Sequence, residues 1–173
     1  MPRLLLFSRD RSGLDPASAT ADRWRLLVRE GQELVFMVLS PISSEWSEPG
    51  LRVIGSGGSV LLVRLVRAYL RSRRMGVFDL LSAQDPLELG LLALWFGKKQ
   101  RIPVEIQDHG GFFDDQPNGE PYWWVRRWLV QLARRQADVI RTVSPYSQQN
   151  LKKMRKPSVS YWLPIAPHDR FRD

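Results

Sequence analysis

Short apolar segments alternate with longer helical segments along the chain, and this alternation constrains the fold more than any other feature. The apolar segments predict strands at Leu4–Phe7, Glu33–Leu39, Leu51–Ile54, Phe78–Ser82, Pro103–Gln107, Val139–Val143 and Val159–Leu163. The intervening segments predict helices at Ala21–Glu30, Val60–Arg74, Leu87–Lys99, Tyr122–Ala137 and Tyr146–Lys153, with a loop at Pro41–Gly50. This order predicts an α/β fold, namely a doubly wound, mostly parallel sheet with helices on both faces.

The length and composition exclude several classes of protein. A chain of 173 residues can bury one sizeable core but is too short for two ordinary domains. It has no cysteine and two histidines, which excludes disulfide scaffolds, thiolate chemistry and multi-histidine zinc sites, so we expect no metal and no cofactor. Its apolar runs are far shorter than the roughly 18 residues of a membrane span. We therefore expect a cytoplasmic protein.

The charge balance points to an anionic partner. The chain carries 26 Lys and Arg against 18 Asp and Glu, a net charge of +8. Such a surface suits nucleic acid, an anionic membrane or a phosphate-bearing ligand, although a basic balance can also be incidental. Because the sequence contains no nucleic-acid reading motif, nucleic acid is not an expected partner.

A glycine-rich segment, Gly55–Ser59, lies between a predicted strand and a predicted helix. Glycines there would let the backbone approach a phosphate at the amino end of the helix. However, Val60 occupies the position of the third glycine of the dinucleotide fingerprint, and the segment follows the third strand instead of the first. A flexible strand-to-helix turn is therefore the favoured interpretation.

In a sheet of this kind, ligands bind at the carboxyl ends of the strands. His109 occupies such a position and is followed by Gly110 and Gly111. An imidazole there can exchange a proton near neutral pH, or it can simply cap a turn. Two further candidates, each of which could contact a ligand or cap the following helix, are the Gln84-Asp85 pair and Ser144.

Two helices are amphipathic and basic. Arg64, Arg67, Arg71 and Arg74 lie within an arc of about 80° of one helix, opposite Leu62, Leu65, Val66, Tyr69 and Leu70. The simplest interpretation is a helix that packs its apolar side on the sheet, and the functional one is a surface for anionic headgroups. In the later helix, Trp123 lies among Arg126 and Arg127, opposite Trp124 and Trp128. Trp123 is thus either an interfacial anchor or a residue that packs beneath a loop or a missing domain.

Three segments carry a family resemblance. The segment Val77–Gly111, which reads VFDLLSAQDPLELGLLALWFGKKQRIPVEIQDHGG, resembles the amino-terminal domain of GT-B glycosyltransferases, family 4 in particular. Residues 137–144, ADVIRTVS, are similar to the family's "ADxVIxVS" segment, and the stretch Val159–Phe171 is similar to the strand and turn that lead to its domain linker. The resemblance covers most of residues 77–171.

The resemblance implies one half of a two-domain enzyme. Residues 1–173 would form a single Rossmann-like domain on the acceptor side, and the carboxy-terminal domain that binds the nucleotide-sugar donor would be absent. Such an enzyme transfers a sugar with retention and usually without metal, and this half alone should be inactive. The family's His-Gly histidine, which lies beside the donor sugar, maps onto His109. The loop after the first strand, with Arg11, Ser12 and Gly13, would line the cleft, although it has one glycine where the family often has a pair.

The expected function is transfer of a sugar from a nucleotide-sugar to a glycan or lipid-linked acceptor. Under this hypothesis Gln84, Asp85, Gly110, Gly111 and Ser144 contact substrate together with the first loop. The arginines of the two basic helices and Trp123 would hold the enzyme on the inner face of the plasma membrane. The alternative is a non-catalytic Rossmann-like module that binds a nucleotide through Gly55–Ser59 or a protein through exposed tryptophans.

Overall fold

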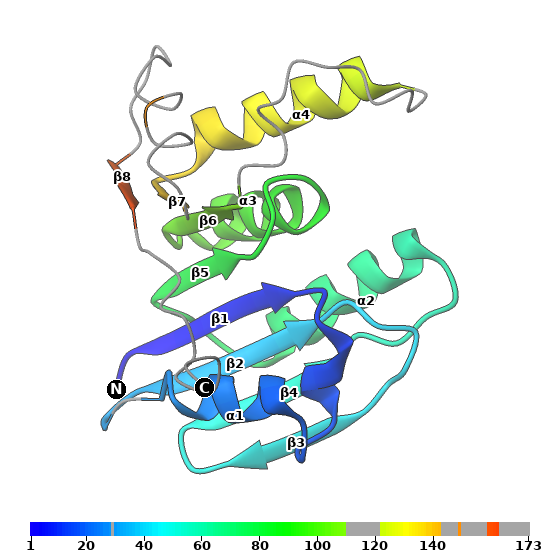
Figure 1. Ribbon diagram of the computed structural model, residues 1–173, viewed down its shortest axis with the longest axis vertical. Coiled ribbons are helices and arrows are strands. Elements are labelled where there is room, and N and C mark those ends of the chain that lie inside the picture. Colours follow the sequence, from blue (N-terminus) through cyan, green and yellow to red (C-terminus); the bar gives the residue numbers. More distant parts are fainter. Residues whose placement is uncertain (29, 110–121, 143–148, 150–158, 163–173) are drawn as a thin grey trace, which may run out of the picture.

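The computed structural model describes residues 1–28, 30–109, 122–142, 149 and 159–162. The described residues form an eight-stranded sheet in the order β3-β4-β2-β1-β5-β6-β7-β8 (Figure 1). The strands are β1 (Arg3–Ser8), β2 (Glu33–Val38), β3 (Glu45–Glu48), β4 (Leu51–Gly55), β5 (Leu80–Ala83), β6 (Val104–Asp108), β7 (Val139–Thr142) and β8 (Val159–Trp162). All neighbouring pairs are parallel except β3 and β4. The predicted α/β class, with a mostly parallel sheet, is confirmed.

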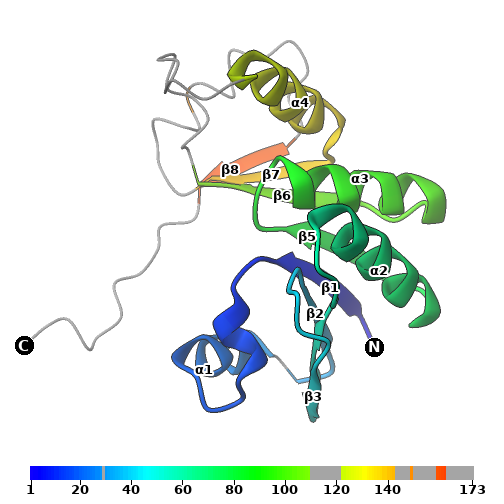
Figure 2. The ribbon, with the colours of Figure 1, turned by 90° about the vertical axis from the view of Figure 1, so that its right-hand side faces the viewer.

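Four α-helices and a short 3-10 helix complete the described part of the chain. They are η1 (Arg11–Leu14), α1 (Ala19–Arg25), α2 (Leu61–Arg74), α3 (Glu88–Gln100) and α4 (Trp123–Gln136). Helix α1 packs on one face of the sheet, and α2, α3 and α4 lie on the other (Figure 2). The helix predicted at Tyr146–Lys153 lies outside the described residues, apart from residue 149.

Each face of the sheet has its own core. On the α1 side, Trp24 stacks on Phe36 of β2 with ring centroids 4.0 Å apart. On the other side, Leu5, Val35 and Ile54 alternate along three neighbouring strands with Leu6, Phe36 and Val53 of the first face. Strands that are apolar on both sides are typical of a parallel sheet covered by helices, and burial of this surface dominates the stability.

One strand departs from the prediction. The segment expected to be a loop at Pro41–Gly50 contains β3, which pairs antiparallel with β4 at the edge of the sheet. Its sequence, Glu45-Trp46-Ser47-Glu48, lacks an apolar run because only Trp46 packs against the core. Polar residues on a short edge strand are common, since one side of such a strand faces solvent.

Helix α4 is rotated the opposite way from its amphipathic pattern, and α2 is rotated only in part. In α2, Leu65 and Tyr69 pack against the core as expected, beside the buried Ala68 and Ser72, whereas Leu62 is 70% exposed. In α4 the residues that face inward include Val130 and Arg134, and the pattern's apolar side lies outside. The prediction that Val66 and Leu70 of α2 pack on the sheet is therefore wrong, and the outer face of this helix layer is partly apolar.

The strand order places a switch point between β1 and β5. The chain moves from β1 to β2 in one direction, and then returns to add β5 on the other side of β1. In parallel sheets of this kind, ligands bind outside the carboxyl ends of the strands at such a point, and we call this position the crevice. In Figure 1 the strand arrows point toward this edge, where α2, α3 and α4 begin.

Candidate functional site

The candidate site lies at the carboxyl ends of β1, β5 and β6. Ser8, the last residue of β1, donates a hydrogen bond from its hydroxyl to the Gln84 side-chain oxygen at 2.5 Å. The backbone amide of Gln84 donates to the carbonyl of Phe7 at 3.1 Å, which extends the pairing of the two strands. Since these bonds cross the switch point, the loop after β1 and the predicted site residue Gln84 are held side by side.

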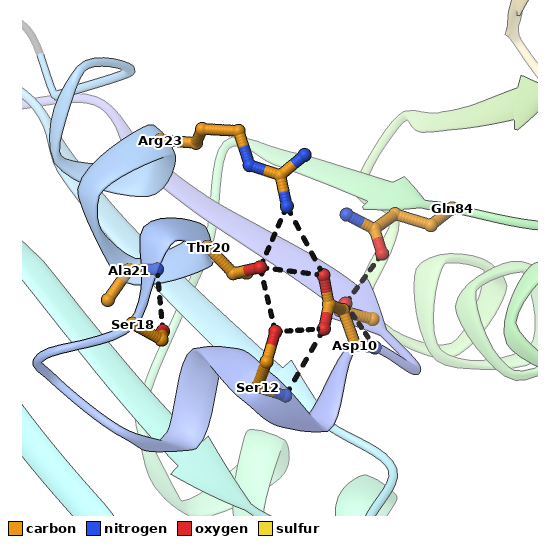
Figure 3. A network of polar contacts seen from close by, with 8 residues as sticks. Asp10, Ser12, Ser18, Thr20, Ala21, Arg23 and Gln84 are labelled. Carbon is orange, nitrogen blue, oxygen red and sulfur yellow. Dashed lines mark hydrogen bonds and ion pairs between the residues drawn. The ribbon is translucent and has the colours of Figure 1, made fainter. Parts of the chain in front are cut away.

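Asp10 is the centre of a polar network on the β1 side of the crevice (Figure 3). Its carboxylate accepts hydrogen bonds from the backbone amide and hydroxyl of Ser12, and from the Thr20 hydroxyl at 3.0 Å. Arg23 donates to the Thr20 hydroxyl at 2.7 Å and lies 3.6 Å from the Asp10 carboxylate. The network therefore ties η1, which begins after Asp10, to α1.

This network also sets the ionisation of Asp10. Partial burial raises the pKa of the carboxyl, but the hydrogen bonds from Ser12 and Thr20, with the positive charge of Arg23, outweigh burial and lower it below the ordinary value. The group is thus an anion at neutral pH that already has donors around it. It can accept a further hydrogen bond from a hydroxyl-rich ligand.

Arg9 connects the same loop to the start of α3. Its guanidinium lies 3.2 Å from the Asp85 carboxylate and also pairs with Glu88. The other oxygen of Asp85 accepts the backbone amides of Leu87 and Leu89 at 2.9 and 3.3 Å, so Asp85 performs the capping role expected before a helix. Burial raises the pKa of Asp85, and the positive charge of Arg9 opposes that rise.

His109 directly follows β6 and is exposed at this edge. The residue before it, Asp108, is fully buried and bonded by the Arg134 side chain of α4, at 2.7 Å from Nε and 2.6 Å from Nη2. Burial lowers the pKa of Arg134, while Asp108 raises it. This buried pair fixes the carboxyl end of β6 to α4, and thereby fixes the point from which His109 projects.

The other predicted residues of the first loop differ in environment. Arg11 and Ser12 are exposed at the crevice. Gly13 is buried beneath Trp24, where an added Cβ would lie 2.1 Å from the indole ring. Close packing therefore explains this glycine. Gly110, Gly111 and Ser144 lie outside the described residues.

Arginine side chains of α2 bind the carbonyl groups of the glycine-rich turn after β4. Arg64 donates to the carbonyls of Gly58 and Ser59 at 2.8 and 2.7 Å, and Arg71 donates to the carbonyl of Gly55 at 2.7 Å. Gly57 and Gly58 have positive φ angles of 71° and 118°, a conformation that glycine adopts readily. These contacts agree with the strand-to-helix turn favoured from sequence.

The predicted membrane residues divide into two groups. Arg64 and Arg71 are half-buried and bonded to the turn, whereas Arg67 and Arg74 of the same helix are exposed. On α4, Trp123 is half-buried with the Arg127 guanidinium 5.7 Å from its ring centroid, and Arg126 is also half-buried.

Sequence reasoning missed several contributors to the site. Ser8, Arg9 and Asp10 follow the first strand and could have been found as polar residues at a carboxyl end. Thr20 and Arg23 carry no such signal, because only the packing of α1 brings them to Asp10. In the sequence, Arg134 cannot be distinguished from the other arginines of α4, which suggest a solvent-exposed side.

The described residues contain neither a metal-binding cluster nor a membrane-spanning helix. Among them, no three His, Asp or Glu side chains gather closely enough to hold a metal ion. No helix in the described ranges combines the length and apolar character that a membrane crossing requires.

Comparison with known proteins adds the family. The sequence model of Glycosyltransferase Family 4 matches residues 25–162. No curated protein is similar to the chain in sequence at a significant level.

Three solved structures share the fold at low sequence identity. A sucrose-phosphate synthase segment from Thermosynechococcus elongatus superposes with a TM-score of 0.64 at 14% identity, covering 96% of this chain and 90% of that one. HepE from Anabaena, solved with UDP, gives 0.57 at 13% identity, covering 98% of this chain and 45% of that one. A UDP-GlcNAc 2-epimerase from Methanocaldococcus jannaschii superposes with a TM-score of 0.52 at 8% identity, covering 94% of this chain and 45% of that one.

The chain thus spans about half of the last two proteins and matches one half of a GT-B fold. At these identities the structural likeness shows the fold alone, and an epimerase shares it. The family follows from the sequence model, which covers most of the chain and includes β6 and the residue His109. The chain belongs to glycosyltransferase family 4 and forms the amino-terminal half of a GT-B fold.

Proposed function

We propose that residues 1–173 are the acceptor-side domain of a retaining glycosyltransferase, which acts with a donor-binding second domain. The observation that carries this proposal is an exposed His109 at the carboxyl end of β6, the strand next to β5 of the switch point, in a chain that belongs to family 4. In the reaction, the bond from the anomeric carbon to the nucleotide breaks and the nucleoside diphosphate leaves. A bond to an acceptor hydroxyl forms, and that hydroxyl loses its proton.

The polar groups of the crevice suit a hydroxyl-rich acceptor. The Asp10 carboxylate and the Gln84 amide can bond to sugar hydroxyls, and Arg11 and Ser12 add donors at the rim. We assign Asp85 to positioning, since it caps α3 and holds Arg9. We propose that His109 contacts the transferred sugar and that Gly13, Gly110, Gly111 and Ser144 complete the site.

We propose a glycan or lipid-linked acceptor and a place on the inner face of the plasma membrane. The support for this location is the basic surface of the chain, whose net charge is +8. An anionic cytoplasmic leaflet attracts such a surface.

The test uses the complete protein that contains this chain. It is incubated with nucleotide-sugars and with membrane-lipid and glycan acceptors, and release of nucleoside diphosphate and labelled product is measured. We expect acceptor-dependent transfer and a product with the donor's anomeric configuration, and we expect residues 1–173 alone to transfer nothing. Inversion, or release that no acceptor stimulates, would contradict the proposal.

A separate NMR titration tests the alternative of a nucleotide-binding module. The amides of Gly57 and Gly58 in the isolated chain can be followed by NMR during addition of a nucleotide-sugar. Because Arg64 and Arg71 already hold this turn, we expect these amide signals to stay in place. Saturable shifts at both glycines would favour the alternative.

A further inference from the structure

We infer that the outer surface of α2, α3 and α4 docks on an anionic phospholipid bilayer. This surface, the outer helix face, is defined by six exposed residues, which are Leu62, Val66, Leu70, Trp95, Trp124 and Trp128. Their side chains are 43 to 70% exposed although they are large and apolar. A concentration of exposed apolar side chains on one side of a protein indicates a binding surface.

The outer helix face extends over three helices that lie on the same side of the sheet. Trp95 of α3 stacks on Tyr69 of α2 with ring centroids 4.0 Å apart. On α4, Trp124 and Trp128 border a groove of about 330 Å³ that Leu132 and Arg127 also line. Figure 2 shows the three helices together on one side of the sheet, away from α1.

The positive charges around this face favour an anionic partner. Helices α2, α3 and α4 carry eleven Lys and Arg residues, of which Arg134 is buried against Asp108, and a single acid, Glu88, which pairs with Arg9. Exposed Arg67, Arg73 and Arg74 flank the apolar residues of α2. Tryptophan and leucine beside arginines, with almost no acid, are the composition of an interfacial membrane surface. The charge therefore complements a layer of lipid phosphates.

The opposite side of the molecule provides a contrast. There Leu26 and Leu27 are 77 and 51% exposed, but the charges near them along the chain are of both signs, with Asp22 and Glu30 beside Arg23 and Arg25. Isolated apolar residues of this kind are normal on a soluble surface. On the outer helix face, by contrast, exposed apolar side chains of three helices lie near the exposed Arg67, Arg73 and Arg74.

The location of the face fits the proposed reaction. Leu62 and Val66 belong to the first half of α2, and Trp124 and Trp128 to the first half of α4. Both helices begin at the edge of the sheet toward which the strands point, the edge that carries His109 (Figure 1). A bilayer in contact with this face would therefore present a lipid-linked acceptor near the crevice.

The test is co-sedimentation with vesicles of phosphatidylcholine alone or mixed with phosphatidylglycerol. We expect binding to the mixed vesicles, weak binding to the neutral ones, and release at high salt. The double variants Leu62→Ser/Val66→Ser and Trp124→Ser/Trp128→Ser should each lower partitioning by about tenfold. The matched control, Leu26→Ser/Leu27→Ser, should bind as wild type.

Three results would overturn the inference. Equal recovery with neutral and anionic vesicles is the first, and unchanged binding of the outer-face variants is the second. The third is a dimer in solution that those variants convert to monomer, without vesicle binding by the wild type. The vesicle assay needs no sugar transfer, so this inference and the proposed function can fail separately.

Discussion

Two regions at the same edge of the sheet have opposite characters. The turn after β4 is rich in glycine, and the arginines of its own helix hold three of its carbonyl oxygens. The loops after β1 and β5 contain one glycine, Gly13, and bond to one another across the switch point, with Arg11 and Ser12 exposed. The glycine motif is thus structural, whereas the loops that lack a motif form the candidate site.

The largest effect should come from the buried pair that supports the site. Arg134→Met removes the positive member of the buried pair with Asp108, and we expect the free energy of unfolding to fall by about 3–5 kcal/mol. Urea denaturation measures this loss. The double variant Asp108→Leu/Arg134→Met removes both charges and should recover much of it. A loss below about 1 kcal/mol for the single variant would contradict the assigned role.

A smaller effect should mark the turn after β4. Arg71→Met removes the hydrogen bonds to the Gly55 carbonyl and the Ser43 hydroxyl, and we expect a loss of about 1–2 kcal/mol in the free energy of unfolding. Arg73→Met, at an exposed position of the same helix, is the matched control and should stay within about 0.5 kcal/mol of wild type. Turnover of the complete enzyme should be unchanged in both. A large loss of turnover in Arg71→Met alone would indicate that the turn after β4 takes part in the active site, which contradicts its purely structural role.

The smallest effect should be pH-dependent. Because the folded state lowers the pKa of Asp10 below its ordinary value of 3.8, its ionised form adds stability above that pH, and this is lost as pH falls through the lowered pKa. Asp10→Asn should therefore cost roughly 0.5–1 kcal/mol at neutral pH, with the gap closing in acid. Urea denaturation of wild type and Asp10→Asn at neutral pH and below pH 3.8 measures this difference, and the exposed Glu30→Gln is the control. If the difference in the free energy of unfolding persists in acid, the charge of Asp10 is not what stabilises the network.

Much of the fold could be predicted from sequence. The expected strand at Leu4–Phe7 is observed at Arg3–Ser8, and the expected helix at Val60–Arg74 at Leu61–Arg74. These elements have a clear apolar period and definite ends. Strand β3 was not predictable in this way, since its stability comes from pairing with β4 at an edge.

The rotation of two helices could not be predicted. The amphipathic pattern assumes that apolar residues face inward, but α2 approaches the sheet through the small Ala68 and Ser72. In α4, the pair of Arg134 with Asp108 turns a charged side inward. A single sequence does not contain these tertiary contacts, so both the site network and the outer helix face required the structure.

The central claim is that sugar transfer takes place beside His109. The direct measurement is the turnover of the complete enzyme with His109→Ala, compared with Gln100→Ala, an exposed change at the last residue of α3. We predict that His109→Ala lowers turnover by about a hundredfold while the fold and vesicle binding are kept, and that Gln100→Ala has no effect. Wild-type turnover in a folded His109→Ala enzyme would contradict the claim.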